Sequence, residues 1–239
     1  MSAYLEIFAG DTIKHEKERN AYNFTRSLIS KHGPIFDLPA LPELLSDEQR
    51  EILQDLNKSS NQDLRFEPPV PLLLGRITFD LDLSPALDKT RRNFISLCTG
   101  DRGLCKSAPN KKLHYLGCPM HRVVKGFVAQ GGDVTRSDGS GGESIFGSRF
   151  PSEKAGLQVL PQRGSLAMAN SGGKSPNNTS QFFVVLSSDD KIHSKLKAKL
   201  KDDEEGEKVL EKLNELGATG DSRDEKPLVP VWIGGCGAL

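Results

Sequence analysis

Several features that would assign this chain to a class of protein are missing from its sequence. The 239 residues carry no formal net charge, because 32 lysines and arginines balance 32 aspartates and glutamates. The charge balance therefore gives no electrostatic reason to expect a nucleic acid or a membrane surface as the main partner. No apolar run approaches the roughly 20 residues of a membrane-spanning helix, and we expect no secretory signal at the N-terminus.

Cysteine and tryptophan are also scarce. The four cysteines form neither a CxxC pair nor a zinc-ligand spacing, so we expect no metal site. Unpaired cysteines are typical of a reducing compartment, which favours a cytoplasmic protein. The single tryptophan, Trp232, falls in the last predicted strand, away from the segment that carries the candidate site.

The first 71 residues suggest one strand and two helices. Residues 3–9 have the composition of a short strand, and the polar residues 12–32 suit a helix that ends before Pro34. Ser46 and Gln49 have the spacing of a capping box, which predicts the start of a second helix.

The remainder of the chain, after a polar linker at residues 57–71, is richer in strand patterns. The patterns predict helices at residues 89–98 and 207–216, and strands at residues 72–83, 122–130, 165–170, 181–186 and 228–233. Many strands, two helices and glycine-rich turns favour a mainly β fold, a closed antiparallel barrel with helical caps.

Residues 121–142 are the most informative segment. Arg122 opens an apolar run, Phe127 and Gln130 follow, and a glycine-rich loop ends the segment. Because an arginine side chain is always charged and has donors only, this strand predicts one wall of a binding site with a fixed cationic donor. A plain surface ion pair for Arg122 is the alternative. A calcium site in the glycine loop is disfavoured, because the EF-hand ligand spacing is absent.

Three runs of sequence carry a family resemblance. They are FISLCTGDRG, LHYLGCPMHRVVKGFVAQGGDVTRSDGSGGESIFG and GSLAMANSGGKSPNNTSQFFVV. In this order they closely resemble the cyclophilins, the cyclosporin-binding peptidyl-prolyl cis–trans isomerases, over about residues 72–190. The resemblance implies a single domain over residues 1–239, a closed eight-stranded antiparallel β-barrel capped by two helices. Its first strand is expected at AYLEIFAGD, which makes residues 11–70 a helical insertion between the first and second barrel strands.

The resemblance also implies the site residues. Arg122 takes the position of the catalytic arginine, with Phe127 and Gln130 beside it. Rotation about an Xaa–Pro bond makes and breaks no covalent bond, so no metal or cofactor is expected. The substrate-binding positions fall on Val128, Gly139, Ser140, Ala169, Asn170, Ser171, Gln181 and Phe183.

The chain departs from the family pattern after Phe183. The family's pocket tryptophan and histidine fall near Lys191 and Leu196, which predicts an altered pocket wall, weak cyclosporin binding and reduced turnover. The longer loop GLCKSAPNKKLHY resembles that of the divergent-loop cyclophilins. In that subgroup, residues matching Cys98, Cys236 and Glu143 are proposed to form a redox switch; inert buried thiols are the alternative.

These observations predict a prolyl isomerase that acts on Xaa–Pro bonds in polypeptides and assists protein folding. The alternative is a catalytically weak, peptide-binding scaffold whose insertion recruits a protein partner. The resemblance does not cover the insertion at 11–70, for which a spacer and an interaction arm both remain open.

Overall fold

The computed structural model describes residues 1–157, 162–170, 177–187, 199–200, 204–219 and 224–239. The chain divides into two compact units. The larger unit comprises Met1–Ala9 and Leu73–Leu239, and the smaller is Gly10–Leu72, the region expected as an insertion at 11–70.

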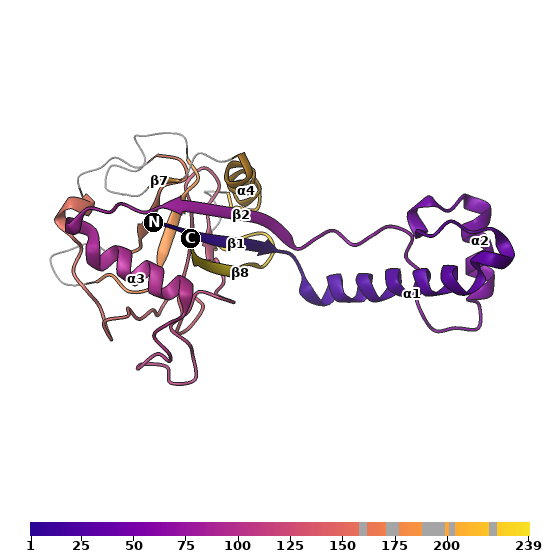
Figure 1. Cartoon of the computed structure of the whole chain (residues 1–239), viewed down its shortest axis with the longest axis horizontal. Helices are drawn as coiled ribbons and strands as arrows, with labels where there is room; N and C mark the ends of the chain where they lie inside the picture. Colours follow the sequence, from indigo (N-terminus) through magenta and orange to yellow (C-terminus); the bar gives the residue numbers. More distant parts are fainter. Residues whose placement is uncertain (158–161, 171–176, 188–198, 201–203, 220–223) are drawn as a thin grey trace. The chain divides into compact units, whose positions relative to one another are not determined.

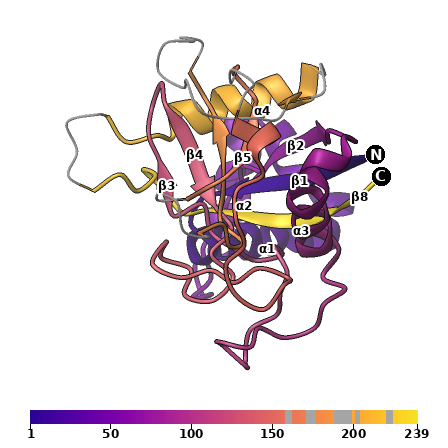
Figure 2. The ribbon, with the colours of Figure 1, turned by 90° about the vertical axis from the view of Figure 1, so that its left-hand side faces the viewer.

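Two four-stranded antiparallel sheets form the larger unit (Figures 1 and 2). The first has the order β7-β2-β1-β8, with β1 at Ser2–Ala9, β2 at Leu73–Asp80, β7 at Lys199–Leu200 and β8 at Val231–Ala238. The second has the order β3-β4-β6-β5, with β3 at Arg122–Val123, β4 at Val128–Gly131, β5 at Leu166–Met168 and β6 at Phe182–Val185.

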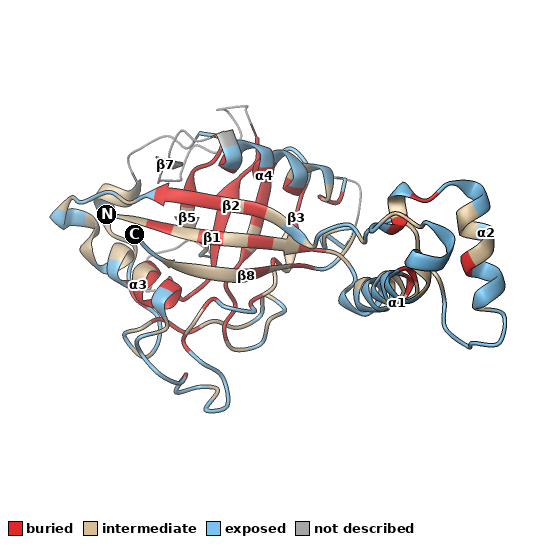
Figure 3. Ribbon diagram, turned by 45° about the vertical axis from the view of Figure 1, so that its right-hand side comes forward, coloured by how far each residue is buried: buried red, intermediate tan, exposed pale blue. Residues whose placement is uncertain are grey.

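The core lies between the inner faces of these sheets, where buried residues concentrate (Figure 3). Along β1 the side chains alternate, and Ala3, Leu5 and Ile7 are buried, as the period of two in a strand requires. Aromatic rings fill the centre: Phe94 meets Phe79 and Phe182 edge-on, at centroid distances of 6.1 and 5.7 Å.

Two helices cover the strands, as the sequence predicts. Helix α3 spans Asp88–Thr99 and packs against β8 and β1, whereas α4 spans Glu204–Glu215 and packs against β2 (Figure 2). Gly100 caps the C-terminus of α3, and its left-handed φ of 68° suits a residue without a side chain. Short 3-10 turns occupy Pro85–Leu87 and Lys154–Leu157.

The described strands do not form the closed eight-stranded barrel expected from the resemblance. On one side, backbone hydrogen bonds link residues 117–120 to β8: Met120 N donates to Val231 O, and Ile233 N donates to Cys118 O, both at 2.9 Å. On the other side, no ladder joins β7 to β5 within the described ranges. Because β7 has two residues and β5 has three, these strands have few backbone N–H and C=O groups with which to form such a ladder.

The single strand predicted at residues 122–130 is instead a hairpin of β3 and β4. Phe127 N donates to Val124 O at 3.0 Å, and Val124 N donates to Val128 O at 2.9 Å, which closes a tight turn. Gly126 allows this turn, because its φ of 69° lies in the left-handed region. The prediction of one strand was therefore wrong, and the reversal places Arg122 opposite Gln130.

The last strand also differs from its prediction at residues 228–233, because β8 continues through a glycine-rich stretch to Ala238. Large side chains of β1 lie over these glycines. A Cβ atom at Gly234 would come within 2.3 Å of the Phe8 ring, and one at Gly235 within 2.2 Å of Glu6. Glycine here permits close approach rather than breaking the strand.

The smaller unit contains two helices, α1 at Thr12–Phe36 and α2 at Asp47–Leu56, and a 3-10 turn at Pro42–Leu44. Ser46 and Gln49 form the predicted capping box at the start of α2. The sequence predicted that the first helix ends before Pro34, but α1 continues through Pro34 to Phe36. A proline in the last turn of a helix removes only one backbone hydrogen bond, so the helix can include it.

The core of the smaller unit is small. Ile29, Leu45 and Leu53 are its buried apolar residues, and Leu28, Leu38, Leu64 and Phe66 pack around them. Residues 57–71 form no helix or strand, as the linker prediction stated. Within the described residues no helix is long and apolar enough to cross a membrane.

Candidate active site

A row of side chains crosses the second sheet from strand to strand. Arg122 on β3 pairs with Gln130 on β4, Gln130 pairs with Phe183 on β6, and Phe183 pairs with Ala167 on β5. Directly opposed residues of an antiparallel sheet point to the same face. The pairing therefore brings a cation, an amide and an aromatic ring together on one surface.

That surface is the face of the sheet opposite the core. Along β6, Phe182 and Val184 belong to the core cluster, whereas Phe183 and Val185 belong to a second apolar cluster with Val128. Phe127, Ala167 and Ala169 pack against this second cluster. The alternation of a strand thus separates two adjacent phenylalanines, so that Phe182 stabilises the fold and Phe183 is available to a ligand.

A pocket of about 500 Å³ opens on this face. Ten predicted site residues line it: Arg122, Phe127, Val128, Gln130, Gly139, Ser140, Ala169, Asn170, Gln181 and Phe183. Ser171, Lys191 and Leu196 lie outside the described residues. Sequence reasoning missed four further lining residues, Gly141, Arg149, Asn177 and Thr179, although Gly141 lies in the glycine-rich loop that the sequence had already indicated.

Hydrogen bonds connect the polar lining residues in a chain. Arg122 Nη1 donates to Gln130 Oε1 at 3.4 Å, and Gln130 Nε2 donates to Gln181 Oε1 at 3.0 Å. Gln181 Nε2 then donates to the carbonyls of Gly139 and Gly141 at 2.8 and 2.7 Å. Each amide is fixed by its neighbours, so the pocket presents its polar groups in a set orientation.

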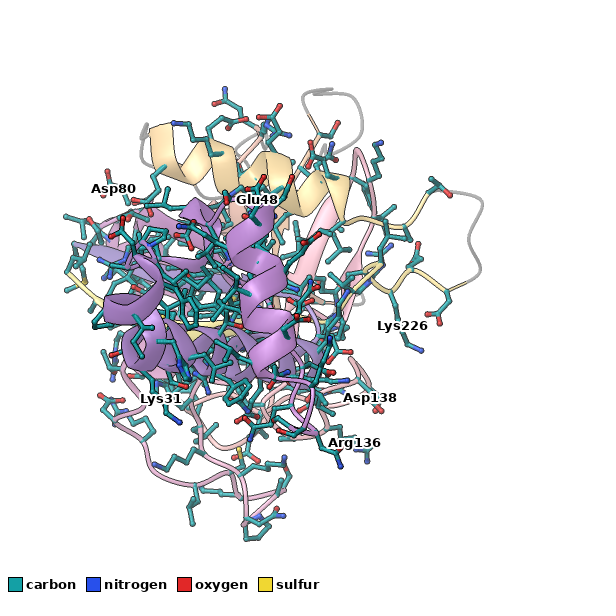
Figure 4. All side chains as sticks on the ribbon, turned by 90° about the vertical axis from the view of Figure 1, so that its right-hand side faces the viewer. Lys31, Glu48, Asp80, Arg136, Asp138 and Lys226 are labelled. Carbon is teal, nitrogen blue, oxygen red and sulfur yellow. The ribbon has the colours of Figure 1, made fainter. Side chains whose placement is uncertain are left out.

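The glycine-rich loop is held from beneath by the fully buried Asp133. Its carboxylate accepts hydrogen bonds from the backbone N–H groups of Arg136, Gly139 and Gly141, at 3.0 Å each, and two more from Thr135. Burial opposes the charge, but these hydrogen bonds outweigh it and lower the pKa of Asp133. The loop's outer residues, Arg136 and Asp138, are exposed (Figure 4).

The Arg122 guanidinium lies between an aromatic ring and a carboxylate. Its central carbon is 5.3 Å from the centroid of the Phe127 ring, within cation–π range. Nε and Nη2 donate to the two carboxylate oxygens of Glu225, at 2.5 and 3.0 Å, and this hydrogen bonding lowers the pKa of Glu225. Sequence reasoning did not find Glu225, which lies 103 residues from Arg122 and in no recognisable motif.

The candidate redox residues occupy two places in the fold. His114 Nε2 lies 3.2 Å from the carbonyl oxygen of Cys98 and 3.5 Å from Cys236 Sγ, and both cysteines are free thiols. Burial raises the pKa of Cys98 well above its usual value and that of Cys236 to about 11. Glu143 instead holds the loop before β3, accepting hydrogen bonds from Lys106 N and from Ser107 N and Oγ.

Comparison with known proteins identifies the family. The sequence profile described as "Cyclophilin type peptidyl-prolyl cis-trans isomerase/CLD" matches residues 70–238, well over half of the chain. The chain therefore belongs to the cyclophilin-type peptidyl-prolyl cis-trans isomerase family, and its larger unit has the cyclophilin fold, with mostly β-sheets and helices. The family match begins where the smaller unit ends.

Two curated relatives have isomerase names. The peptidyl-prolyl cis-trans isomerase CYP21-1 of Arabidopsis thaliana is 39% identical over 151 residues, which cover 63% of this chain and 64% of the relative. The peptidyl-prolyl cis-trans isomerase cyp11 of Rhizopus delemar is 46% identical over 113 residues, which cover 47% of this chain and 32% of the relative. The matches thus span less than two thirds of either relative's length.

A solved structure is also similar. The cyclophilin-type isomerase of Cryptosporidium parvum, crystallised in the presence of the dipeptide Ala-Pro, superposes with a TM-score of 0.54 at 28% sequence identity. The superposition covers 70% of this chain and 94% of the Cryptosporidium chain.

Proposed function

We propose that this protein catalyses cis–trans rotation about Xaa–Pro peptide bonds in polypeptides and thereby assists protein folding. The observation that carries the proposal is the Arg122 guanidinium at the edge of an apolar cup formed by Phe127, Val128 and Phe183. The family membership and the names of the curated relatives support the same activity.

The reaction requires loss of amide resonance, against a barrier of about 18–20 kcal/mol. As the bond twists, the prolyl nitrogen regains a lone pair that can accept a hydrogen bond. A donor aimed at that nitrogen stabilises the twisted state more than the planar one, which is the condition for catalysis. Arg122 can supply this donor, because its guanidinium keeps its protons at any working pH.

The other pocket groups would hold the two sides of the rotating bond. The apolar cup can bury the pyrrolidine ring, while Gln130 and the backbone of Asn170 can hold the carbonyl and the preceding residue. Fixing both ends confines rotation to one bond. The Cryptosporidium structure, crystallised in the presence of Ala-Pro, supports a proline-containing peptide as the ligand class.

Substitution of Arg122 tests this mechanism. In a protease-coupled assay on a peptide with one Xaa–Pro bond, we expect Arg122→Ala to lower kcat/KM by about 100-fold, the value of one preorganised charged donor. Arg102→Ala is the matched control, because Arg102 is an exposed arginine that does not line the pocket, and it should retain wild-type activity.

Two results would contradict the proposal. Activity that persists in Arg122→Ala would refute the role of the guanidinium. An inactive wild type that still binds the peptide would favour the peptide-binding scaffold.

Three finer features remain predictions. Weak cyclosporin binding is predicted from the altered pocket wall at Lys191 and Leu196. A protein partner is predicted for the insertion at 11–70, which would bind through its exposed surface. The cytoplasmic location is supported by four free thiols.

The redox switch is also a proposal. Thiolates attack more readily than thiols, so a pKa of about 11 makes Cys236 slow to react at pH 7, and its reactivity should rise as the pH approaches 11. We expect mild oxidant at pH 9 to remove two titratable thiols from the wild type and none from Cys236→Ser. An unchanged wild-type thiol count would exclude pairing of Cys98 with Cys236.

A further inference from the structure

Glu225 occupies a position beside the reacting group that the mechanism above does not use. It lies on the segment between α4 and β8, next to the exposed Lys226 (Figure 4), and its carboxylate takes the Nε–Nη2 edge of Arg122. We propose that Glu225 is a positioning residue, which fixes the Arg122 guanidinium in the orientation required for catalysis. This inference rests on the proposed isomerase function.

The backbone places the Glu225 side chain beside Arg122. Val123 N, on the residue that follows Arg122, donates to Glu225 O at 2.9 Å. Val123 O in turn accepts from Ala218 N at 2.9 Å, so both backbone groups of Val123 are bonded to the segment after α4. The segment is therefore attached to β3 at the residue adjacent to Arg122, and the carboxylate is held there by main-chain bonds.

The bidentate pairing leaves the opposite edge of the guanidinium to the pocket. Of the five N–H groups of an arginine, Glu225 takes two and Gln130 Oε1 takes one, from Nη1. No acceptor among the described residues takes the other two N–H groups, one on each terminal nitrogen. The N–H on Nη1 shares its nitrogen with the Gln130 contact, on the side of the substrate-binding row, and the N–H on Nη2 points along the end of the planar group, away from the edge that Glu225 binds.

Three contacts define the guanidinium plane together. The centroid of the Phe127 ring lies 5.3 Å from the central carbon of the guanidinium. Glu225 binds one edge of the guanidinium, and Gln130 contacts Nη1 on the other side. Because two parallel hydrogen bonds already hold the planar guanidinium, the Arg122 side chain loses little further conformational freedom when substrate binds. Without Glu225, the side chain would have to be ordered at each turnover, and this cost would appear in the chemical step.

The test separates turnover from binding. NMR exchange spectroscopy at saturating Xaa–Pro peptide gives kcat, and a titration with the same peptide gives Kd. We expect Glu225→Ala to lower kcat by about tenfold while Kd changes less than about twofold, since the carboxylate orients a donor rather than contacting the peptide.

Two further variants sharpen the result. Glu225→Gln keeps the shape and one acceptor, so its kcat should fall between those of the wild type and Glu225→Ala. Asp224→Asn removes the neighbouring carboxylate, which pairs with Lys226 at 3.0 Å, and it should leave both constants unchanged. A similar loss in Asp224→Asn would mean that only the loop charge matters, which would overturn the proposal.

A spectroscopic measurement reports positioning without activity. The Nε–H resonance of Arg122 should be protected from solvent exchange in the wild type and lose that protection in Glu225→Ala. Unchanged protection, or a kcat that stays constant or rises in Glu225→Ala, would overturn the proposal, and a rise would identify the carboxylate as a competitor of the substrate. If the wild type proves inactive, the isomerase proposal fails, and the protection measurement alone decides whether Glu225 orients Arg122.

Discussion

Individual residues illustrate how this pocket is held in shape, and Asp133 is the clearest case. The residue itself does not line the pocket, yet its carboxylate ties together the loop that contributes Gly139, Ser140 and Gly141. A fully buried carboxylate is costly unless its oxygens are satisfied, and here both of them accept hydrogen bonds. The geometry of one wall therefore depends on a single ionised group.

Replacing Asp133 with asparagine should destabilise the protein. One carboxylate oxygen becomes an NH₂ group that faces N–H donors, so we expect a loss of about 2–4 kcal/mol at pH 7, measured by urea unfolding. The pKa of folded Asp133 is lowered, so its stabilising effect is present above the unfolded value of about 3.9 and disappears as the pH falls through the folded pKa.

The difference in the free energy of unfolding between the wild type and Asp133→Asn should accordingly become smaller when the urea unfolding is repeated at progressively lower pH. The exposed Asp138 on the same loop provides the control, because Asp138→Asn should change stability much less. A difference that is constant down to pH 2 would show that the Asp133 carboxylate is not the source of the effect.

The β3–β4 hairpin is the element that assembles the site. It turns a stretch of nine residues back on itself, so that Arg122 and Gln130 become cross-strand neighbours and Phe127 lies under the guanidinium. The turn depends on Gly126, whose N–H donates to Asn214 Oδ1 at 2.7 Å and whose φ is 69°. The arginine and its aromatic partner are thus positioned by one left-handed residue.

Substitution of Gly126 should therefore affect stability and activity together. A Cβ atom there would meet no atom within 4 Å, so the cost of Gly126→Ala is that of the backbone alone, about 1–2 kcal/mol. Thermal unfolding should show Gly126→Asn to be milder, because asparagine tolerates the left-handed region. Equal losses in both variants, or a comparable loss in the exposed Lys125→Ala, would argue against a backbone effect.

At the scale of the whole molecule, the smaller unit is inserted into the larger one between the paired strands β1 and β2. The smaller unit leaves the larger after β1 and returns at β2, where Phe8 and Leu73 are paired residues of neighbouring strands. The two ends of the smaller unit are therefore close together, as in a long hairpin loop. The larger unit contains its own core and all the described residues of the pocket.

Removal of the smaller unit should leave the larger unit folded. We expect replacement of residues 9–72 by an Asn-Gly turn to preserve cooperative unfolding and to keep kcat/KM within about threefold, because a two-residue turn can join the paired residues Phe8 and Leu73 of the two antiparallel strands. In the shortened chain, Arg122→Ala should cause the same loss as in the full chain. An unfolded or inactive shortened protein would mean that the smaller unit takes part in folding or catalysis.

The sequence by itself determined the local elements and most of the side chains that line the pocket. The capping box at Ser46, the helices near residues 89–98 and 207–216, and the alternation along β1 all follow from interactions within a few residues. Motif resemblance located most of the described pocket lining, because those residues lie in continuous runs. Local patterns did not resolve the hairpin turn at Gly126 or the extension of β8 across glycines that face large β1 side chains.

Only the tertiary structure decided which distant groups meet. The pairing of Arg122 with Glu225 spans 103 residues, and the approach of His114 to Cys236 spans 122. The separation of Phe182 into the core and Phe183 into the pocket likewise depends on which face of β6 meets the other sheet. Such contacts are set by strand register and sheet packing, which no short segment of sequence specifies, because they result from the fold as a whole.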